Sequence, residues 1–146
     1  MKKYLLTLFL LSLIISACSA PATPEPSASL VGAWKLTAYG PVSAPVPAVE
    51  GVEAGLTFNA DGTLSGNSGC NGYSGSYTVE GAQITFTAPI VSTLMLCDET
   101  IMAQEEAVYQ VLTDTASYQI EDTQLTLTNN DRVLVFNTTV SYPSYP

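Results

Sequence analysis

Short runs in which apolar and polar residues alternate fill most of the chain after residue 30. A period of two places every second side chain on one face of a β-strand, and it does not produce the apolar stripe of a helix. Turn signals separate the runs, at residues 59–62 (Asn-Ala-Asp-Gly), 80–81 (Glu-Gly), 122 (Asp) and 129–131 (Asn-Asn-Asp). The pattern predicts about eight short strands, joined largely by hairpins.

One segment breaks the alternation and predicts an amphipathic helix between Asp98 and Thr113, with Asp98 as its N-cap. Its apolar residues fall at helical spacing, at Ile101, Met102, Val108, Tyr109 and Leu112. We interpret Glu105 and Glu106 as part of its solvated face. Residues 41–55 are predicted as a long loop rich in Pro, Val and Ala, and residues 91–95 as a further short strand.

These elements place the chain in the mainly β class with one α-helix. A small antiparallel sheet, curled so that its inner face packs on the helix, satisfies both periodicities. The residues predicted for the inner face are Trp34, Leu36, Leu56, Phe58, Tyr77, Ile84, Phe86, Leu125 and Leu127.

The first thirty residues carry the marks of export. A basic start at Lys2 and Lys3 precedes an apolar run over residues 4–15, which is too short to span about 30 Å of hydrocarbon. The Ile-Ser-Ala-Cys that ends at Cys18 resembles the bacterial lipobox. The alternative is an ordinary signal peptide that contains a cysteine.

This reading divides the chain into four parts. We expect a signal peptide over residues 1–17, and a lipidated Cys18 with a disordered Pro/Ser/Ala tether over residues 18–29. One folded domain would cover residues 30–137, and a disordered tail residues 138–146. The protein is then exported and anchored to a membrane of the bacterial envelope through Cys18.

Charge narrows the classes of partner. After removal of the signal peptide, thirteen acidic residues face only Lys35 and Arg132, so the net charge is −11. Two cations cannot build a basic groove, and nucleic acid is therefore not an expected partner. The same charge gives no attraction to anionic headgroups, so the lipid itself must hold the protein at the membrane.

Two cysteines remain beside Cys18. In an exported protein, Cys70 and Cys97 are predicted to form a disulfide, which would stabilise the fold by roughly 3.6 kcal/mol in the chain-entropy model. The alternative is two free, buried thiols.

Only one residue, Ser68, stands in a sequence context typical of a catalytic nucleophile. Ser68 stands in a Gly-rich stretch, SGNSGCNGYSGSY (residues 65–77), that looks like the context of a nucleophilic serine. The chain has no histidine to act as its base, Cys70 stands where a nucleophile elbow needs glycine, and the only available lysine is Lys35. The stretch therefore reads as a structural corner stapled by Cys70.

Carboxylates offer no better case for catalysis. Asp98-Glu99 and Glu105-Glu106 are candidate pairs for glycoside hydrolysis, but capping and solvation explain them more simply. No calcium-binding or phosphate-binding loop is present in the sequence. We expect no enzyme activity, no catalytic residue, no cofactor and no metal.

An ordered set of residues resembles the META domain of the HslJ-like bacterial envelope lipoproteins over roughly residues 30–137. It comprises Trp34; Leu56-Thr57-Phe58-Asn59 with Asp61-Gly62; Ser65-Gly66 and Ser68-Gly69-Cys70-Asn71; Tyr73, Gly75 and Tyr77; Ser92-Thr93-Leu94-Met95 with Cys97; Met102 and Glu105; and Tyr118 with Leu125-Thr126-Leu127. The resemblance implies a partly open, lipocalin-like barrel with a helix. It implies no catalytic residues.

The leading hypothesis is a non-enzymatic, lipid-anchored envelope protein that binds a protein partner or serves in envelope stress. The alternatives are a carrier of a small hydrophobic ligand or acyl chain in the barrel mouth, with Gly66 and Gly75 leaving a cavity, and a binding module similar to secretion-pilot lipoproteins. We expect a monomer. Tyr39 and Tyr73 are the candidate partner-binding residues, and both could equally be edges of the core.

Overall fold

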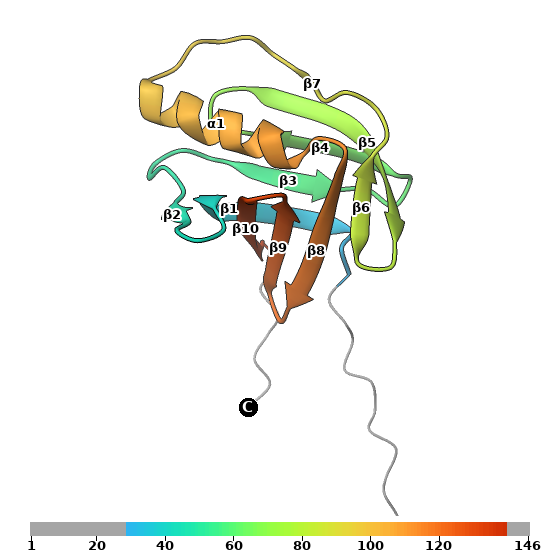
Figure 1. Ribbon diagram of the computed structural model, residues 1–146. Coiled ribbons are helices and arrows are strands. Elements are labelled where there is room, and N and C mark those ends of the chain that lie inside the picture. The colour runs from blue at the N-terminus through green and yellow to red at the C-terminus, as the bar shows by residue number, and fades with distance from the viewer. Residues whose placement is uncertain (1–28, 140–146) are drawn as a thin grey trace, which may run out of the picture.

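Ten strands and one helix make up residues 29–139, the part of the chain that the computed structural model describes (Figure 1). In chain order they are β1 (Gly32–Pro41), β2 (Val46–Pro47), β3 (Gly55–Phe58), β4 (Thr63–Asn67), β5 (Gly72–Glu80), β6 (Gln83–Phe86), β7 (Val91–Ser92), α1 (Glu99–Val111), β8 (Thr115–Glu121), β9 (Gln124–Asn129) and β10 (Arg132–Thr138). The predicted signal peptide, Cys18 and all but the last residue of the predicted tether lie outside the described residues, and so does most of the predicted tail.

Eight antiparallel strands form a closed barrel. Their order is β10-β9-β8-β6-β5-β4-β3-β1, and β1 closes the ring by pairing with β10. The long β1 makes this possible, because its first residues pair with β3 while its pairing with β10 runs on to Pro41. Closure leaves these strands without the open edge that a curled sheet would expose.

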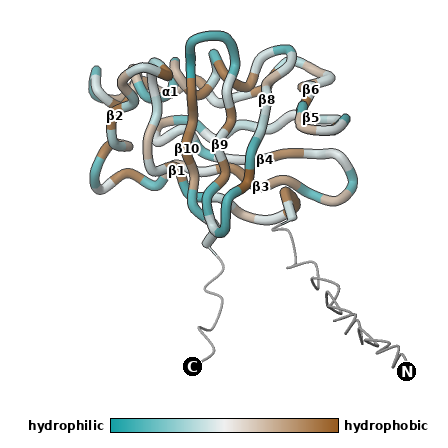
Figure 2. Tube along the Cα trace, turned by 60° about the horizontal axis from the view of Figure 1, so that its bottom comes forward, coloured by the Kyte–Doolittle hydropathy of each residue, from teal (hydrophilic) through white to brown (hydrophobic). Residues whose placement is uncertain are grey.

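The core fills the inside of the barrel. The nine residues predicted for the inner face are all buried, and they join Leu64, Val111 and Leu134 in one apolar cluster. Figure 2 shows the same division by colour, with hydrophilic residues gathered at the hairpin turns.

The predicted hairpin turns are confirmed. Gly62 and Gly81 lie in their turns at positive φ, and so do Asp122 and Asn130. Left-handed backbone is cheapest for glycine and is tolerated by Asn and Asp, which is why these residues mark the turns in the sequence.

The helix lies across one end of the barrel, against β1, β9 and β10 (Figure 1). Asp98 is its N-cap residue and its carbonyl accepts the amides of Ile101 and Met102, but its side chain makes no capping bond. The predicted N-cap residue is therefore confirmed, and it caps the helix through its backbone alone. Among residues 29–139, no helix is long and apolar enough to cross a membrane.

Two short strands lie outside the ring. The predicted loop over residues 41–55 contains β2, which pairs with β1, and the predicted strand over residues 91–95 shrinks to the two residues of β7, which pairs with β5. The first and last strands also meet, since Trp34 pairs with Thr138. Both ends of the described chain therefore leave the barrel together, at the end away from the helix (Figures 1 and 2).

Candidate functional site

The Gly-rich stretch forms a tight corner between β4 and β5. Ser68 is fully buried there, and its hydroxyl donates to the carboxylate of Glu105 and lies 3.1 Å from the carbonyl of Asn71. Gly69 has a φ of 112°, which few other residues adopt. The arrangement is that of a structural corner, as predicted, and Ser68 offers no surface to a substrate.

Glu105 holds the corner from the helix. Only 7% of the residue is exposed, and its carboxylate also accepts the backbone amide of Asn71 at 3.1 Å and the side-chain amide of Asn71 at 3.0 Å. Placing Glu105 on a solvated face was therefore wrong, whereas Glu106 is exposed as predicted. A carboxylate can be buried here because three donors replace its hydration.

Gln104, also on α1, ties a second segment to the corner. Its side chain donates to the carbonyl of Ser68 at 2.8 Å and accepts the backbone amide of Val49 at 2.8 Å. Sequence reasoning missed this residue. The available signal was the pair of polar residues at 104 and 105, which interrupts the helix's apolar stripe between Ile101 and Val108.

The side chain of Asn71 also binds the chain that follows β7. Its side-chain oxygen accepts the Met95 amide at 2.8 Å and the Thr93 hydroxyl at 2.7 Å. Its side-chain nitrogen donates to the Met95 carbonyl at 3.1 Å. With the bond to Glu105, every hydrogen-bonding group of this buried amide has a partner.

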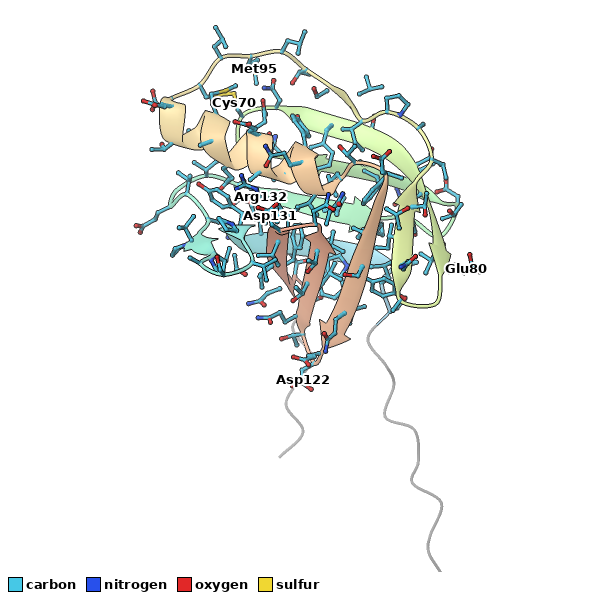
Figure 3. The ribbon with its side chains drawn as sticks, in the orientation of Figure 1. Cys70, Glu80, Met95, Asp122, Asp131 and Arg132 are labelled. Atoms are coloured by element: carbon cyan, nitrogen blue, oxygen red, sulfur yellow. A yellow bond between two sulfur atoms is a disulfide. The ribbon has the colours of Figure 1, made fainter. Side chains whose placement is uncertain are left out.

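A disulfide joins the same two segments. Cys70, which is buried, is bonded to the half-buried Cys97 just before the helix. Figure 3 places Cys70 beside the start of α1, beneath the arc of chain that carries Met95. A structural disulfide of this kind is typical of an oxidising, extracytoplasmic compartment.

The arc held in this way is apolar and exposed. Leu94 is 93% exposed, Leu96 91%, Val91 69% and Met95 56%. We call residues 91–96 the apolar loop. Its backbone is fixed from below by Asn71 and at its end by Cys97, while its large side chains point into solvent. Clustered apolar exposure on a fixed backbone is the usual mark of an interaction site.

The two tyrosines proposed as partner-binding residues do not lie at this surface. Tyr73 is 5% exposed, its hydroxyl donates to the carbonyl of Gly55 at 3.1 Å, and its ring packs edge-on against Tyr109. Burial raises its pKa well above the usual range. Tyr73 is a core residue, so its assignment to a partner surface was wrong. Tyr39 is half-buried and packs on the core from β1.

The glycines expected to leave room for a ligand instead accommodate side chains. A Cβ on Gly66 would lie 2.5 Å from the Tyr73 ring, and one on Gly75 would lie 2.7 Å from Ile90. Both places are filled by the neighbouring residue. The inside of the barrel is therefore packed at the positions where the carrier hypothesis needs space.

An open groove lies between the segment that follows β6 and the C-terminal end of α1. Its volume is about 530 Å³, and its lining includes Phe86, Ile90, Ser92, Tyr109, Leu112 and Asp114. Among the described residues, no group of three His, Cys, Asp or Glu side chains is placed to hold a metal ion.

The META domain family model matches residues 28–141. Among solved structures, the chain is similar to a protein from Burkholderia xenovorans determined by NMR, at 25% identity and a TM-score of 0.62, over 84% of this chain and 100% of that one. A second protein determined by NMR is similar at 19% identity and a TM-score of 0.60, over 73% of this chain and 88% of that one.

No curated protein matches the sequence. The family match nevertheless extends over the whole barrel, the helix, the stapled corner and the apolar loop. The chain belongs to the META domain family.

Proposed function

We propose that this protein is a non-enzymatic, lipid-anchored protein of the bacterial envelope that binds a partner protein through the apolar loop. The observation that carries the proposal is the near-complete exposure of Leu94 and Leu96 on a backbone that Asn71 and the disulfide hold in place. A loop that is already ordered loses little further conformational entropy when it binds.

The Cys70–Cys97 disulfide supports a location outside the cytoplasm. The lipobox-like sequence that ends at Cys18 supports the anchor. Burial of Ser68 and the structural bonds of Glu105 agree with a role that does not involve catalysis. Packing of Tyr73 and Ile90 against Gly66 and Gly75 disfavours a carrier with its ligand inside the barrel.

Charge and position favour a protein over the lipid surface as the partner of the loop. Asp98 and Glu99 are exposed directly after Cys97, and carboxylates at this place repel anionic headgroups. The loop also lies at the end of the molecule opposite to the one where the described chain begins (Figure 1). A protein with an apolar cleft and basic residues at its rim fits this surface.

Photo-cross-linking in native membranes tests the proposal. Benzoylphenylalanine replaces Leu94 or Leu96 in separate variants, and it replaces Val79 as the matched control, since Val79 is an exposed apolar residue 43% accessible on a different hairpin. We expect a discrete protein adduct from positions 94 and 96 and none from 79. Adducts with lipid alone, equal adducts from all three positions, or none from folded protein would each contradict the proposal.

A further inference from the structure

Strand pairing in the barrel wall is interrupted on one side of β7. The partner of β5 changes along its length, because β6 pairs with the stretch from Tyr77 to Glu80 while β7 pairs with Tyr73 and Ser74. On its other side β6 meets β8 only from Gln83 to Thr85. Within residues 29–139, no strand pairs with the outer side of β7. It is an edge strand beside the groove.

The hydrogen bonds of this segment show which backbone groups face the groove. The amide of Thr93 donates to the carbonyl of Gly72 on β5, so Thr93 turns its polar groups inward. Alternate residues of an antiparallel strand turn their N–H and C=O groups to opposite sides. Ser92 therefore presents its backbone groups away from β5. Ser92 and Ile90 line the groove, whereas Val91 between them does not.

The opposite wall and the floor offer an apolar surface. Phe86 and Leu112, 7% and 1% exposed, contribute the floor, and the end of α1 supplies Tyr109. The volume of about 530 Å³ falls within the roughly 300–1,000 Å³ of typical ligand sites. An apolar side chain of a bound segment would rest on this floor.

A second observation concerns the Tyr109 hydroxyl. It is buried and has no hydrogen-bond partner, and among the described residues no other buried side-chain nitrogen or oxygen is left in this state. An unpaired buried hydroxyl is unfavourable, so a bound segment that comes within reach of the Tyr109 hydroxyl would gain a hydrogen bond. Backbone amides supply both a donor and an acceptor for such a bond.

Charge at the groove selects among such ligands. Asp114 lies at its rim, and neither of the domain's two cations, Lys35 and Arg132, lines it. A segment with a basic residue at the Asp114 end is favoured, and an acidic one is disfavoured.

We infer that the groove binds an extended peptide segment of another protein, which adds as a strand to the free edge of β7 and places an apolar side chain over Phe86 and Leu112. Strand addition uses main-chain hydrogen bonds for affinity and the apolar floor for selection. This site uses the groove side of β7, whose two residues begin the apolar loop, and it does not depend on the proposed role of Leu94 and Leu96.

Titration followed by ¹⁵N NMR of the full chain in detergent micelles tests the inference. The probes are capped hexapeptides of alternating Thr and apolar residues, with a terminal Lys and with Val, Leu, Phe or Tyr at the central apolar position. We expect saturable shifts of the Ile90, Ser92 and Thr113 amides. Methylation of alternate peptide nitrogens should weaken binding at least about tenfold, because it removes the strand hydrogen bonds.

Protein variants provide a matched control. Thr113→Trp places a large side chain at the groove rim and should abolish the shifts, whereas Gln110→Trp, at an exposed helix position outside the groove, should leave them unchanged. Thermal unfolding of both variants checks that they are folded. Absence of shifts with every peptide at millimolar concentration, shifts that survive N-methylation, or shifts with octanoate but not with peptides would overturn the inference.

Discussion

The side-chain amide of Asn71 pairs with the backbone of Met95 as a neighbouring strand would. The Met95 amide donates to the Asn71 side-chain oxygen at 2.8 Å, and the Asn71 side-chain nitrogen donates to the Met95 carbonyl at 3.1 Å. One buried side chain thus supplies both bonds that would otherwise require another segment of backbone. Because Asn71 binds the backbone of the apolar loop from the side of the corner, the side chains of the loop remain free to face solvent.

Replacement of Asn71 by alanine should release the loop and destabilise the domain. The substitution leaves the carboxylate of Glu105 without one of its three donors and the backbone of Met95 without its partner, which should cost about 3 kcal/mol. The backbone amide of residue 71 can still donate to Glu105. Urea denaturation measures the cost, and hydrogen exchange at the Met95 amide, expected to accelerate roughly tenfold or more, reports the release.

Asn67→Ala is the matched control for that experiment. Asn67 is an exposed asparagine in the same corner, and its side-chain oxygen accepts the amide of Gly69 at 2.7 Å. Its loss should cost about 1 kcal/mol or less and leave exchange at Met95 unchanged. Equal effects of the two substitutions would show that Asn71 does not act as a clamp.

Glu105→Gln tests the buried carboxylate. The amide group of glutamine brings a donor to a place where the Ser68 hydroxyl and two donors of Asn71 already point, so we expect a loss of about 2–3 kcal/mol in unfolding free energy. Glu106→Gln removes the same charge one residue later on the exposed side of α1 and should change stability by less than about 0.5 kcal/mol. Equal losses in the two variants would mean that Glu105 stabilises the domain through the charge of the helix and not through its bonds to Ser68 and Asn71.

Gly66→Ala should be poorly tolerated although Gly66 lies in a strand. The added Cβ would lie 2.3 Å from the carbonyl oxygen of Gly55, which cannot move without breaking the β3–β4 pairing, and 2.5 Å from the Tyr73 ring. We expect a loss of about 3 kcal/mol by thermal unfolding. Gly72→Ala is the control, because its Cβ would meet nothing closer than 3.9 Å. If both variants unfold at the same temperature, the close approach at Gly66 is not limiting.

The disulfide should contribute both stability and order. Double replacement of Cys70 and Cys97 by alanine opens a loop with a sequence separation of 27 and should cost roughly 3.6 kcal/mol in the chain-entropy model. We also expect the photo-cross-linking yield from position 94 to fall, since the loop loses its C-terminal attachment. Unchanged stability in the double variant, measured against the wild type under non-reducing conditions, would contradict the first expectation.

Alkaline pH should unfold the domain before Tyr73 ionises in the native state. Burial raises the pKa of Tyr73, and burial also raises that of Tyr77. In the unfolded chain a tyrosine loses its proton near pH 10, so the stability is fully present below that pH and falls as pH rises beyond it, by up to about 1.4 kcal/mol per unit for each group. Denaturation midpoints between pH 8 and 12 measure the slope. An undiminished slope in Tyr73→Phe would show that this tyrosine does not contribute.

Most of the barrel could be predicted from the sequence because the physics of a hairpin is local. Alternation at Leu56 and Phe58, or at Leu125 and Leu127, shows which face is buried, and the Gly, Asn and Asp of the turns show where each strand reverses. Neither signal shows which two strands pair to close the barrel. The pairing of β1 with β10 joins residues about a hundred positions apart and is set by packing of the whole inner face.

The candidate sites could be predicted less well, since their residues obey no local rule. Glu105 looks like a solvated helix residue until Ser68 and Asn71 approach it from another segment. Tyr73 looks like a surface aromatic until Gly66 and Gly55 make room for its ring and its hydroxyl. Leu94 lies in the strand predicted over residues 91–95, and the exposure of Leu94 and Leu96 follows only from the place of Asn71 beneath them.

By itself, the sequence determined the class of the fold, the turns, the identity of the core and the absence of any histidine-based chemistry, since composition and short-range periodicity act along the chain. Only the tertiary structure decided that the ring is closed, that a polar corner is buried under the helix, and that an apolar loop is held outside it. Those features arise from contacts between segments that are distant in the sequence. Whether a polar group is paired, or an apolar group buried, depends there on which residues the fold brings next to it.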